Sequence, residues 1–472
     1  MSKRSKPYIV ILTTSLLTDR MFLYSECLAK LAERAEVEVW STSVMNSEQA
    51  SVWDQCPVKV VPYPKVGSFR EFPHNFLRRA NERAWDYRLQ LPSRLSMHRH
   101  VRQAQASLRS RCARALGSAV GVLGSHRVFE RGLEKFLIRH PRSPEAEARF
   151  KQRRPDLVVT TGPFWFDEPA VAAHATRLGI PVVAMIPSWD NVTTKNRMVF
   201  RYDGFLVWSE QTRSELRAVY PDTRDKEIFV TGATQFDVFR QPRFEESRAE
   251  FCQRHGLRPE LPIVVYAIGS PHFLHGEHFG ALHLAERIRR GDLGSVQLLV
   301  RPHPTKDNAE LVSQFAPFGP AVVVQQVARP GTVLNQRSQR EEQVLDWIST
   351  FRHADVVVNL SSTVTVDAAL FDKPVVNVNY DPSPEKKQED LIKDVNSIWS
   401  HFRPIAESGG VALVNSHDEL VAAVQAYLKH PELHRQQRRW VAEHVCGYTD
   451  GKCGERVAQA ILDFIHQSSL KK

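Results

Sequence analysis

Short apolar runs alternate with amphipathic segments along most of the chain. Near the start, an apolar run at residues 7–14 is followed by a helical pattern over residues 18–34 and a second apolar run at residues 37–40. Runs of this length, separated by helical periodicity, are typical of strands in a parallel sheet that helices cover on both faces. The pattern predicts an α/β fold that opens with a strand–helix–strand unit.

The same alternation resumes after residue 154 and continues to the carboxyl end. The expected strands are short and rich in β-branched residues, at 156–160, 182–186, 204–208, 228–230 and 262–268, and then from about 296, 321, 355, 375 and 411. With 472 residues, the chain is long enough for two cores. We therefore expect two doubly wound, Rossmann-like lobes at residues 1–240 and 262–445, a polar linker at 241–261 and a C-terminal helix at 446–472.

Residues 70–154 interrupt the alternation and carry most of the positive charge. This segment has 20 lysines and arginines against 7 aspartates and glutamates, whereas the whole chain has a net charge of +10. Apolar residues such as Phe72, Trp85 and Leu123 are interleaved with the arginines, which predicts a helical insert with basic faces in the first lobe. Such helices suit an anionic membrane surface or a lipid-pyrophosphate acceptor, and a solvated face without a partner explains them equally well. Nucleic acid is not expected, because no RNA- or DNA-binding motif accompanies the charge.

Cysteine spacing and the first apolar run bear on the location of the protein. The six cysteines form neither a C-x-x-C pair nor a zinc-like pattern, which argues against a disulfide framework and a structural metal. The first apolar run is too short and too polar for a signal peptide or a membrane span. The expected location is the cytoplasm, with a peripheral position at the inner face of the membrane if the basic insert binds lipid.

The first candidate site follows the strand expected at residues 296–300. Arg301 and His303, in the sequence Arg-Pro-His-Pro, would stand at its carboxyl end, the edge where open α/β sheets bind ligands. The arginine suits a bidentate phosphate contact, but a salt bridge that supports the loop explains it equally well. The histidine, taken alone, is at least as typical of an ordinary turn.

The second candidate site follows the strand expected at residues 355–360. Three hydroxyl residues separate this strand from a helix expected at 364–371: Ser361, Ser362 and Thr363. Hydroxyl and free N–H groups would thus converge at a helix N-terminus, which favours a phosphate. Asp367, one turn into the helix, would accept hydrogen bonds from a ribose. Helix capping alone explains two of the three hydroxyl residues, so the phosphate hypothesis depends on the joint occurrence with the His303 turn.

Polar residues also follow other expected strands. Gly269 and Ser270 follow the strand at 262–268, where backbone N–H groups would approach a phosphate, although a tight turn is as frequent. In the first lobe, Asp190 follows the strand at 182–186 and is the first candidate for a general base, with a loop cap as its alternative. Further candidates for the base are Asp167, Glu168 and His272.

The two turns resemble known motifs. The His303 and Ser361 turns are similar to the HP and S-S/T motifs with which bacterial sialyltransferases hold the phosphate of a CMP donor. With Asp450-Gly451-Lys452 and Arg456 near the carboxyl end, they also resemble the D-G-K-x-x-x-R ending of the CDP-glycerol glycerophosphotransferases of teichoic acid and capsule assembly. The resemblance covers roughly residues 262–460. It implies a GT-B fold, in which two Rossmann-like lobes face a central cleft.

The resemblance also implies a reaction. We expect metal-independent transfer of a sugar from a nucleotide-activated donor, linked to CMP, CDP or UDP, to a cell-surface polysaccharide or a lipid-linked glycan. His303 and the Ser361 turn would stabilise the leaving phosphate. Lys452 and Arg456 would reach phosphate or close the lobes. Neither a cofactor nor a metal is expected. Three alternatives remain, namely a CDP-glycerol-type glycerophosphotransferase, a non-hydrolysing sugar-nucleotide 2-epimerase and a non-catalytic subunit of polysaccharide assembly.

Overall fold

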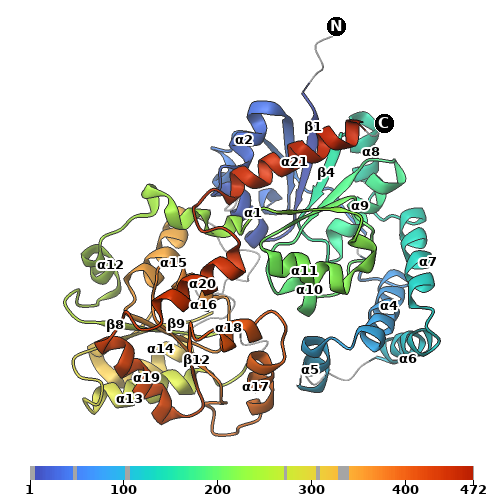
Figure 1. Cartoon of the computed structure of the whole chain (residues 1–472). Coiled ribbons are helices and arrows are strands. Elements are labelled where there is room, and N and C mark those ends of the chain that lie inside the picture. The colour runs from blue at the N-terminus through green and yellow to red at the C-terminus, as the bar shows by residue number, and fades with distance from the viewer. Residues whose placement is uncertain are drawn as a thin grey trace. The chain divides into compact units, whose positions relative to one another are not determined.

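The chain forms two units (Figure 1) in the computed structural model, which describes residues 6–45, 50–67, 69–100, 107–270, 274–303, 309–327 and 340–470. Unit 1 comprises Met1–Leu95, Arg102–Arg240 and Cys446–Lys472, and unit 2 comprises Ser96–Val101 and Gln241–Val445. The final segment of the chain therefore belongs to the unit that contains the first strand.

Unit 1 is built on a parallel sheet whose described strands run in the order β3-β2-β1-β4-β5-β6-β7. Their bounds are β1 Tyr8–Thr13, β2 Glu36–Ser41, β3 Lys59–Pro62, β4 Leu157–Thr160, β5 Val182–Met185, β6 Gly204–Val207 and β7 Glu227–Val230. The central strands β4, β5 and β6 are buried over their whole length, which explains their continuous apolar sequences. Every strand predicted for this lobe is present. The edge strand β3 is not among the predictions, because it is partly exposed and its apolar signal is weak.

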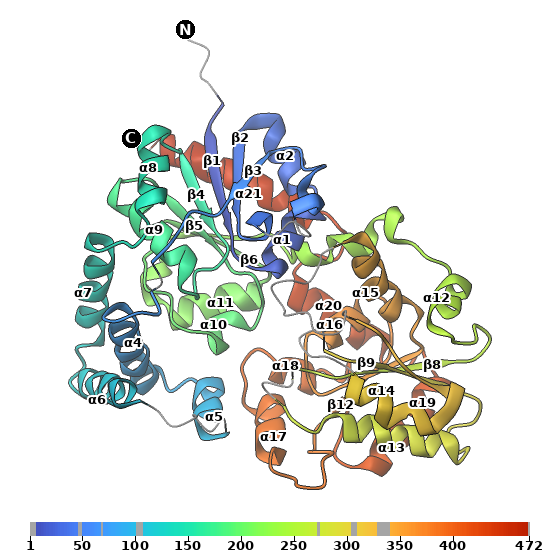
Figure 2. The ribbon, with the colours of Figure 1, turned by 180° about the vertical axis from the view of Figure 1, so that it is seen from behind.

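Helices cover this sheet on both faces (Figures 1 and 2). Outside the basic insert they are α1 Leu16–Leu23, α2 Cys27–Arg34, α9 Asp167–Arg177, α10 Asn191–Thr194, α11 Glu210–Val219 and α21 Cys453–Leu470. The single helix expected over 18–34 is wrong, since the chain breaks between α1 and α2. Ser25 lies at the break, where its hydroxyl donates to Met21 O at 2.6 Å and accepts from Cys27 N at 3.4 Å. These local bonds compete with the helical hydrogen bonds.

The basic insert is helical, as predicted. Its helices are α4 His74–Leu89, α5 Pro92–His100, α6 Leu108–Val122, α7 His126–Arg139 and α8 Pro144–Gln152. The end of α5 clusters with unit 2, where Ser96 Oγ and His100 Nε2 contact Asp394 Oδ2 at 2.6 Å and 3.1 Å. Helix α6 packs on α4 through glycines, and a Cβ at Gly117 would lie only 2.3 Å from the carbonyl oxygen of Ala80.

Unit 2 contains a second parallel sheet, with the described order β10-β9-β8-β11-β12-β13. Its strands are β8 Ile263–Ala267, β9 Gln297–Arg301, β10 Val322–Val324, β11 Val356–Asn359, β12 Val375–Val378 and β13 Ala412–Val414. Its helices are α12 Arg248–His255, α13 His278–Arg289, α14 Ala309–Phe315, α15 Glu341–His353, α16 Val364–Ala369, α17 Glu389–Ser397, α18 Arg403–Glu407, α19 His417–Lys429 and α20 Arg435–Cys446. Counted from β8, the strand order is 3-2-1-4-5-6, the Rossmann order.

The stretch at 241–261, expected as a linker, is part of unit 2. It contains α12, which begins with a capping box formed by Ser247 and Glu250 and buries Phe251. Arg248 ties the helix to the sheet through Asp355 Oδ2 at 2.9 Å. Charged side chains that cap and anchor a helix therefore produce the polar composition of this stretch.

The strand order reverses between β1 and β4 in unit 1 and between β8 and β11 in unit 2. In open α/β sheets, the carboxyl edge at such a reversal is the usual ligand site. Among the described residues, no helix is long and apolar enough to cross a membrane.

The close contact between α4 and α6 yields a stability prediction. Gly117→Ala should lower the urea midpoint of unfolding, because the added Cβ would meet Ala80 O at 2.3 Å and Arg83 Cβ at 2.7 Å. Overpacking of this kind costs about 1–3 kcal/mol. Gly132→Ala in α7 is the matched control, since a Cβ there meets nothing within 4 Å and the helix should gain stability. Equal midpoints for the two variants would contradict this packing.

Candidate functional site

A buried carboxylate occupies the reversal point of unit 2. Glu277, the N-cap residue of α13, is 2% exposed. Its Oε2 accepts from the N–H of Gly269, just after β8, at 2.6 Å, and its Oε1 accepts from the N–H of Leu360, just after β11, at 3.3 Å. One side chain thus holds together the two strand ends at which a ligand of this fold is expected.

Burial controls the ionisation of Glu277. Removal of the carboxyl group from water raises its pKa from 4.5 to about 7, although the two N–H bonds favour the charged form and act in the opposite direction. The N–H of Gly269, predicted to approach a phosphate, is therefore already used by a protein carboxylate. His272, a candidate base, lies outside the described residues, because these stop at Ser270 and resume at residue 274.

The Ser361 turn follows β11 as predicted and is held by asparagines. Ser361 has a φ of 46°, in the left-handed region, and its hydroxyl donates to Asn396 Oδ1 at 2.7 Å. The Ser362 N–H donates to Asn359 Oδ1 at 2.9 Å, and its hydroxyl oxygen accepts from Val364 N at 3.3 Å. The turn is thus a fixed loop at the carboxyl end of β11.

Helix α16, behind this turn, is shorter than expected. It ends at Ala369 and begins after Thr363, whose side chain makes no capping bond. A helix of six residues has only a small dipole, so the hydroxyl and N–H groups of the turn would supply most of any attraction for an anion. Asp367 in this helix is 6% exposed, which leaves little of its carboxylate accessible to the predicted ribose.

Arg301 ends β9 and is turned into unit 2. Its Nη1 donates to Gln325 Oε1 at 2.7 Å and to Thr350 Oγ1 at 3.3 Å, and it lies 3.7 Å from Asp346 Oδ2. Burial lowers the pKa of the guanidinium, while Asp346 and Asp367 raise it. Of the two explanations that the sequence left open, these contacts favour an arginine that supports the loop.

His303 stands two residues beyond Arg301, after β9. Because β9 and β11 are both hydrogen-bonded to β8, the His303 and Ser361 turns leave the same edge of one sheet. They are separated by two strand spacings, roughly 10 Å. Pro304, which follows the histidine, lies outside the described residues. The fold therefore brings the two predicted turns to one edge, on either side of the strand that carries Gly269.

A buried glutamate also lies where the strand order of unit 1 reverses, between β1 and β4. Glu168, in the first turn of α9, is fully buried. Its carboxylate accepts from Thr14 Oγ1 at 2.7 Å, Thr161 N at 2.6 Å and Gly162 N at 2.7 Å, groups that follow β1 and β4. Burial raises its pKa and these donors lower it. A carboxylate so enclosed holds the strand ends together and does not present an accessible base.

Asp190 follows β5 in unit 1 and is surrounded by donors. Its Oδ1 accepts from Ser188 Oγ at 2.6 Å and Asn191 Nδ2 at 3.0 Å, and its Oδ2 accepts from Thr194 Oγ1 at 2.9 Å. All three donors are side chains of the same loop, and the Asp190 carboxylate makes no capping bond at the start of α10.

The Asp-Gly-Lys motif lies in unit 1 and folds onto itself. Asp450 accepts hydrogen bonds from Nη1 and Nη2 of Arg456, at 2.8 Å and 2.6 Å, and from the N–H of Lys452 at 3.1 Å. The hydrogen bonds from Arg456 lower the pKa of Asp450 to about 2. Gly451 has a φ of 77°, which explains the glycine. Arg456 is therefore committed to the aspartate of its own motif, and Lys452 remains exposed.

Asp237 fixes the start of the last helix. It is 2% exposed and accepts from the N–H groups of Cys453 at 3.0 Å and Gly454 at 2.6 Å. Burial raises its pKa to about 6. Asp237 thus attaches the start of α21 to the rest of unit 1.

The sequence did not reveal Glu277 as a site residue, and it offered Glu168 only as a candidate base. A usable signal exists, because each is an acidic residue at the start of the helix that follows a central strand. Within the described ranges, no group of three or more His, Cys, Asp or Glu side chains is placed to hold a metal ion.

The raised pKa of Glu277 predicts a pH effect. An unfolded glutamate loses its proton near 4.5, whereas Glu277 keeps its proton until about pH 7, so unfolding releases a proton between these values. The free energy of unfolding should therefore fall as pH rises through this window, by about 3 kcal/mol at most. In urea titrations at several pH values, Glu277→Gln should abolish this fall in the free energy of unfolding. The exposed control Glu260→Gln should show the same fall as wild type. Parallel pH profiles for wild type and Glu277→Gln would contradict the assignment.

Comparison with known proteins identifies the family. The family model for CDP-Glycerol:Poly(glycerophosphate) glycerophosphotransferase matches residues 176–463. The match starts earlier than the resemblance seen in the sequence and includes the end of unit 1, with Asp190. No curated protein matches the chain.

Solved structures support the fold. An S. aureus MnaA–UDP structure has a TM-score of 0.55 at 11% identity, covering 98% of this chain and 97% of that one. The UDP-GlcNAc 2-epimerase from Neisseria meningitidis, bound to UDP-GlcNAc, has a TM-score of 0.54 at 10% identity, covering 97% and 100%. At such identities the likeness concerns the fold alone, and it confirms the predicted GT-B-like pair of lobes. Because the family model matches well over half of the sequence, the chain belongs to the CDP-glycerol:poly(glycerophosphate) glycerophosphotransferase family, a family of transferases.

Proposed function

We propose that this protein transfers a glycerol phosphate unit from CDP-glycerol to the end of a poly(glycerophosphate) chain and releases CMP. The match of the family model to residues 176–463 carries this proposal, because the matched region includes every residue predicted for the site, from Asp190 to Arg456. The main expectation from the sequence, a sugar transferase, therefore gives way to the glycerophosphotransferase alternative.

The proposed reaction is a phosphoryl transfer. A hydroxyl oxygen of the acceptor attacks the phosphorus that carries glycerol, the bond from this phosphorus to the bridging oxygen breaks, and CMP leaves with the electron pair. The proton of the hydroxyl passes to a base or to water. Such transfers have loose transition states, so positioning and stabilisation of charge account for most of the catalysis.

Unit 2 is the proposed donor side. The His303 and Ser361 turns leave one edge of its sheet on either side of β8, roughly 10 Å apart, a separation that the two phosphates and the ribose of the donor can bridge. His303 and the Ser361 turn would contact the phosphate of the leaving CMP. Arg301 and Glu277 would hold these loops in place from inside the unit, through the contacts described above.

Unit 1 is the proposed acceptor side. Asp190 would orient the acceptor hydroxyl or accept its proton, and Lys452 would offer a positive charge to the phosphates of the acceptor.

The six cysteines are free thiols, which supports the expected location in the reducing cytoplasm, where a CDP-activated donor would be available.

Donor-dependent release of CMP tests this function. With CDP-glycerol and poly(glycerophosphate), wild-type protein should release CMP, and His303→Ala should lower the rate more than about tenfold, because the leaving phosphate loses a stabilising contact. His430→Ala, an exposed histidine of the same unit, is the matched control and should keep the wild-type rate. Unfolding midpoints would verify that both variants are folded.

The same assay separates the alternatives. With UDP-GlcNAc we expect neither release of UDP nor formation of an epimer. Epimerisation of UDP-GlcNAc without any release of CMP from CDP-glycerol would replace the proposed function by the epimerase alternative. Wild-type rates in folded His303→Ala would remove the histidine from the site while leaving the reaction in place.

Asp190→Asn tests the role of the acceptor side. If Asp190 accepts or orients the proton, kcat should fall by about 100-fold or more while the KM for CDP-glycerol stays the same. The exposed Asp225→Asn in the same unit should leave both constants unchanged. A drop in the unfolding midpoint with an unchanged kcat would show that Asp190 serves only to hold its loop together.

A further inference from the structure

The segment between β5 and β6, which carries Asp190, forms a single turn of helix, α10. Asp190 is the N-cap residue of this turn, and Lys195 is its C-cap residue. A single turn leaves the carbonyl groups at its carboxyl end without helical partners, and it is not stable by itself. The position of Asp190 therefore depends on contacts that reach the segment from other elements.

Helix α5 holds the carboxyl end of α10. The hydroxyl of Ser93, a residue that is 1% exposed, donates to Thr193 O at 2.7 Å. The next residue, Arg94, donates from Nη1 to Lys195 O. Two carbonyl groups that the short helix cannot satisfy thus find donors on neighbouring residues of the insert.

A carboxylate of α4 fixes Arg94 in turn. Arg94 Nε lies 2.5 Å from Asp86 Oδ1, and Nη2 lies 3.1 Å from Asp86 Oδ2. Both side chains are largely buried. A guanidinium that is bound through two nitrogens has a fixed plane and a fixed direction. The third nitrogen is thereby directed at Lys195 O, so Arg94 connects α4 rigidly to the end of α10.

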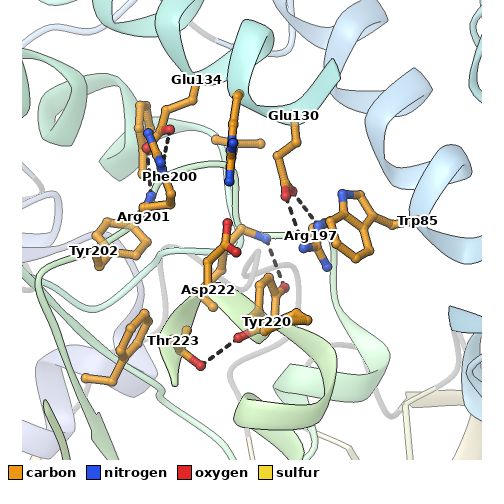
Figure 3. Close-up of a pocket in the computed structure, with 15 residues that line it drawn as sticks. Trp85, Glu130, Glu134, Arg197, Phe200, Arg201, Tyr202, Tyr220, Asp222 and Thr223 are labelled. Carbon is orange, nitrogen blue, oxygen red and sulfur yellow. Dashed lines mark hydrogen bonds and ion pairs between the residues drawn. The ribbon is translucent and has the colours of Figure 1, made fainter. Parts of the chain in front are cut away.

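Arg197 fixes the segment a second time, just beyond α10. Its Nε and Nη2 pair with Glu130 of α7, at 2.5 Å and 3.2 Å (Figure 3). Its Nη1 donates to Val219 O at 3.1 Å. The guanidinium carbon lies 3.5 Å from the ring centroid of Trp85 and 4.5 Å from that of Tyr220. All three nitrogens of this buried arginine are therefore used inside unit 1.

The cavity beside this ion pair does not suit a substrate. Its volume is about 40 Å³, and aromatic side chains such as Tyr202 line it (Figure 3). Because one water molecule needs about 10–15 Å³, this space is too small for a nucleotide or a glycerol phosphate unit. A second carboxylate of its lining, Glu134, is paired with Arg201, whose Nε lies 2.7 Å from Oε2. The ion pairs around the cavity thus hold the segment and do not form a ligand site.

We propose that Arg94 and Arg197 are positioning residues of the acceptor side, which hold the segment of Asp190 so that its carboxylate meets the acceptor hydroxyl. They act on this segment from two helices of the insert, through Asp86 of α4 and Glu130 of α7. A displacement of about 1 Å at a reacting group can cost about 100-fold in rate. The inference rests on the proposed function, and neither arginine is assigned a contact with substrate.

Lysine substitutions test this role in the CMP release assay. Arg94→Lys and Arg197→Lys keep the charge and lose the planar fork. Each should lower kcat about tenfold or more and leave the KM for CDP-glycerol unchanged, because the proposed donor side lies in unit 2. Arg201→Lys is the matched control, since Arg201 also pairs with a glutamate of α7, and it should keep the wild-type kcat. A wild-type kcat in both test variants would overturn the proposal.

A double variant separates positioning from a merely structural role. If Arg197 acts through Asp190, Arg197→Lys should lower kcat no further once Asp190→Asn is present. An arginine that only stabilises the fold would add its full loss to that of Asp190→Asn, and this result would contradict the proposal. Unfolding midpoints would verify that the single and double variants are folded.

Amide hydrogen exchange measures the hold on the segment without any assay of activity. Backbone amides of residues 188–196 should exchange about fivefold faster or more in Arg94→Lys and in Arg197→Lys than in wild type and in Arg201→Lys. Residues 356–366 of unit 2 should keep the wild-type rates. Wild-type exchange across 188–196 in both test variants would refute the proposal. If wild type released no CMP, the proposed function would fail, while faster exchange in the two variants would still support the hold on the segment.

Discussion

The fold depends on the enclosure of a carboxylate where the strand order of each sheet reverses. A reversal leaves backbone N–H groups of two adjacent strand ends without partners from the sheet, and a buried polar group without a partner costs free energy. Glu277 in unit 2 and Glu168 in unit 1 satisfy these groups from the helix that follows a central strand. In each unit, one buried glutamate therefore satisfies the N–H groups at the strand ends. It lies beneath the edge of the sheet at which a ligand is expected.

Two arginines of the kind that binds phosphate are likewise bonded inside the protein. Arg301 lies within hydrogen-bonding reach of Gln325 and Thr350, and Arg456 is bound to Asp450. Each has the residue type of a phosphate ligand, yet each is committed within its own unit. The His303 and Ser361 turns carry short side chains at the carboxyl edge of the sheet of unit 2, and the Ser361 turn is held by Asn359 and Asn396. Short groups on a held turn can stabilise charge without large rearrangement.

Apolar periodicity predicted most of this architecture. The strands at 157–160 and 356–359 are buried on both faces, so their sequences are almost purely apolar and easy to recognise. The half-exposed edge strand β3 has no such signal. The break at Ser25 depends on a hydroxyl that bonds to nearby backbone, and the polar stretch at 241–261 resembles a linker because its charges cap and anchor a helix. For the site, the sequence placed the two turns at strand ends but gave no view of what Arg301 and Gly269 contact inside the unit, because those partners are distant along the chain.

The attachment of α21 to unit 1 has a consequence for synthesis. Unit 2 consists almost entirely of residues 241–445, whereas unit 1 needs both the first strand and the last eighteen-residue helix, whose start is bonded to Asp237. During translation the ribosome therefore finishes the sequence of the second lobe first. Unit 1 therefore keeps an incomplete surface until residues 446–472 have been synthesised, after the whole of residues 241–445.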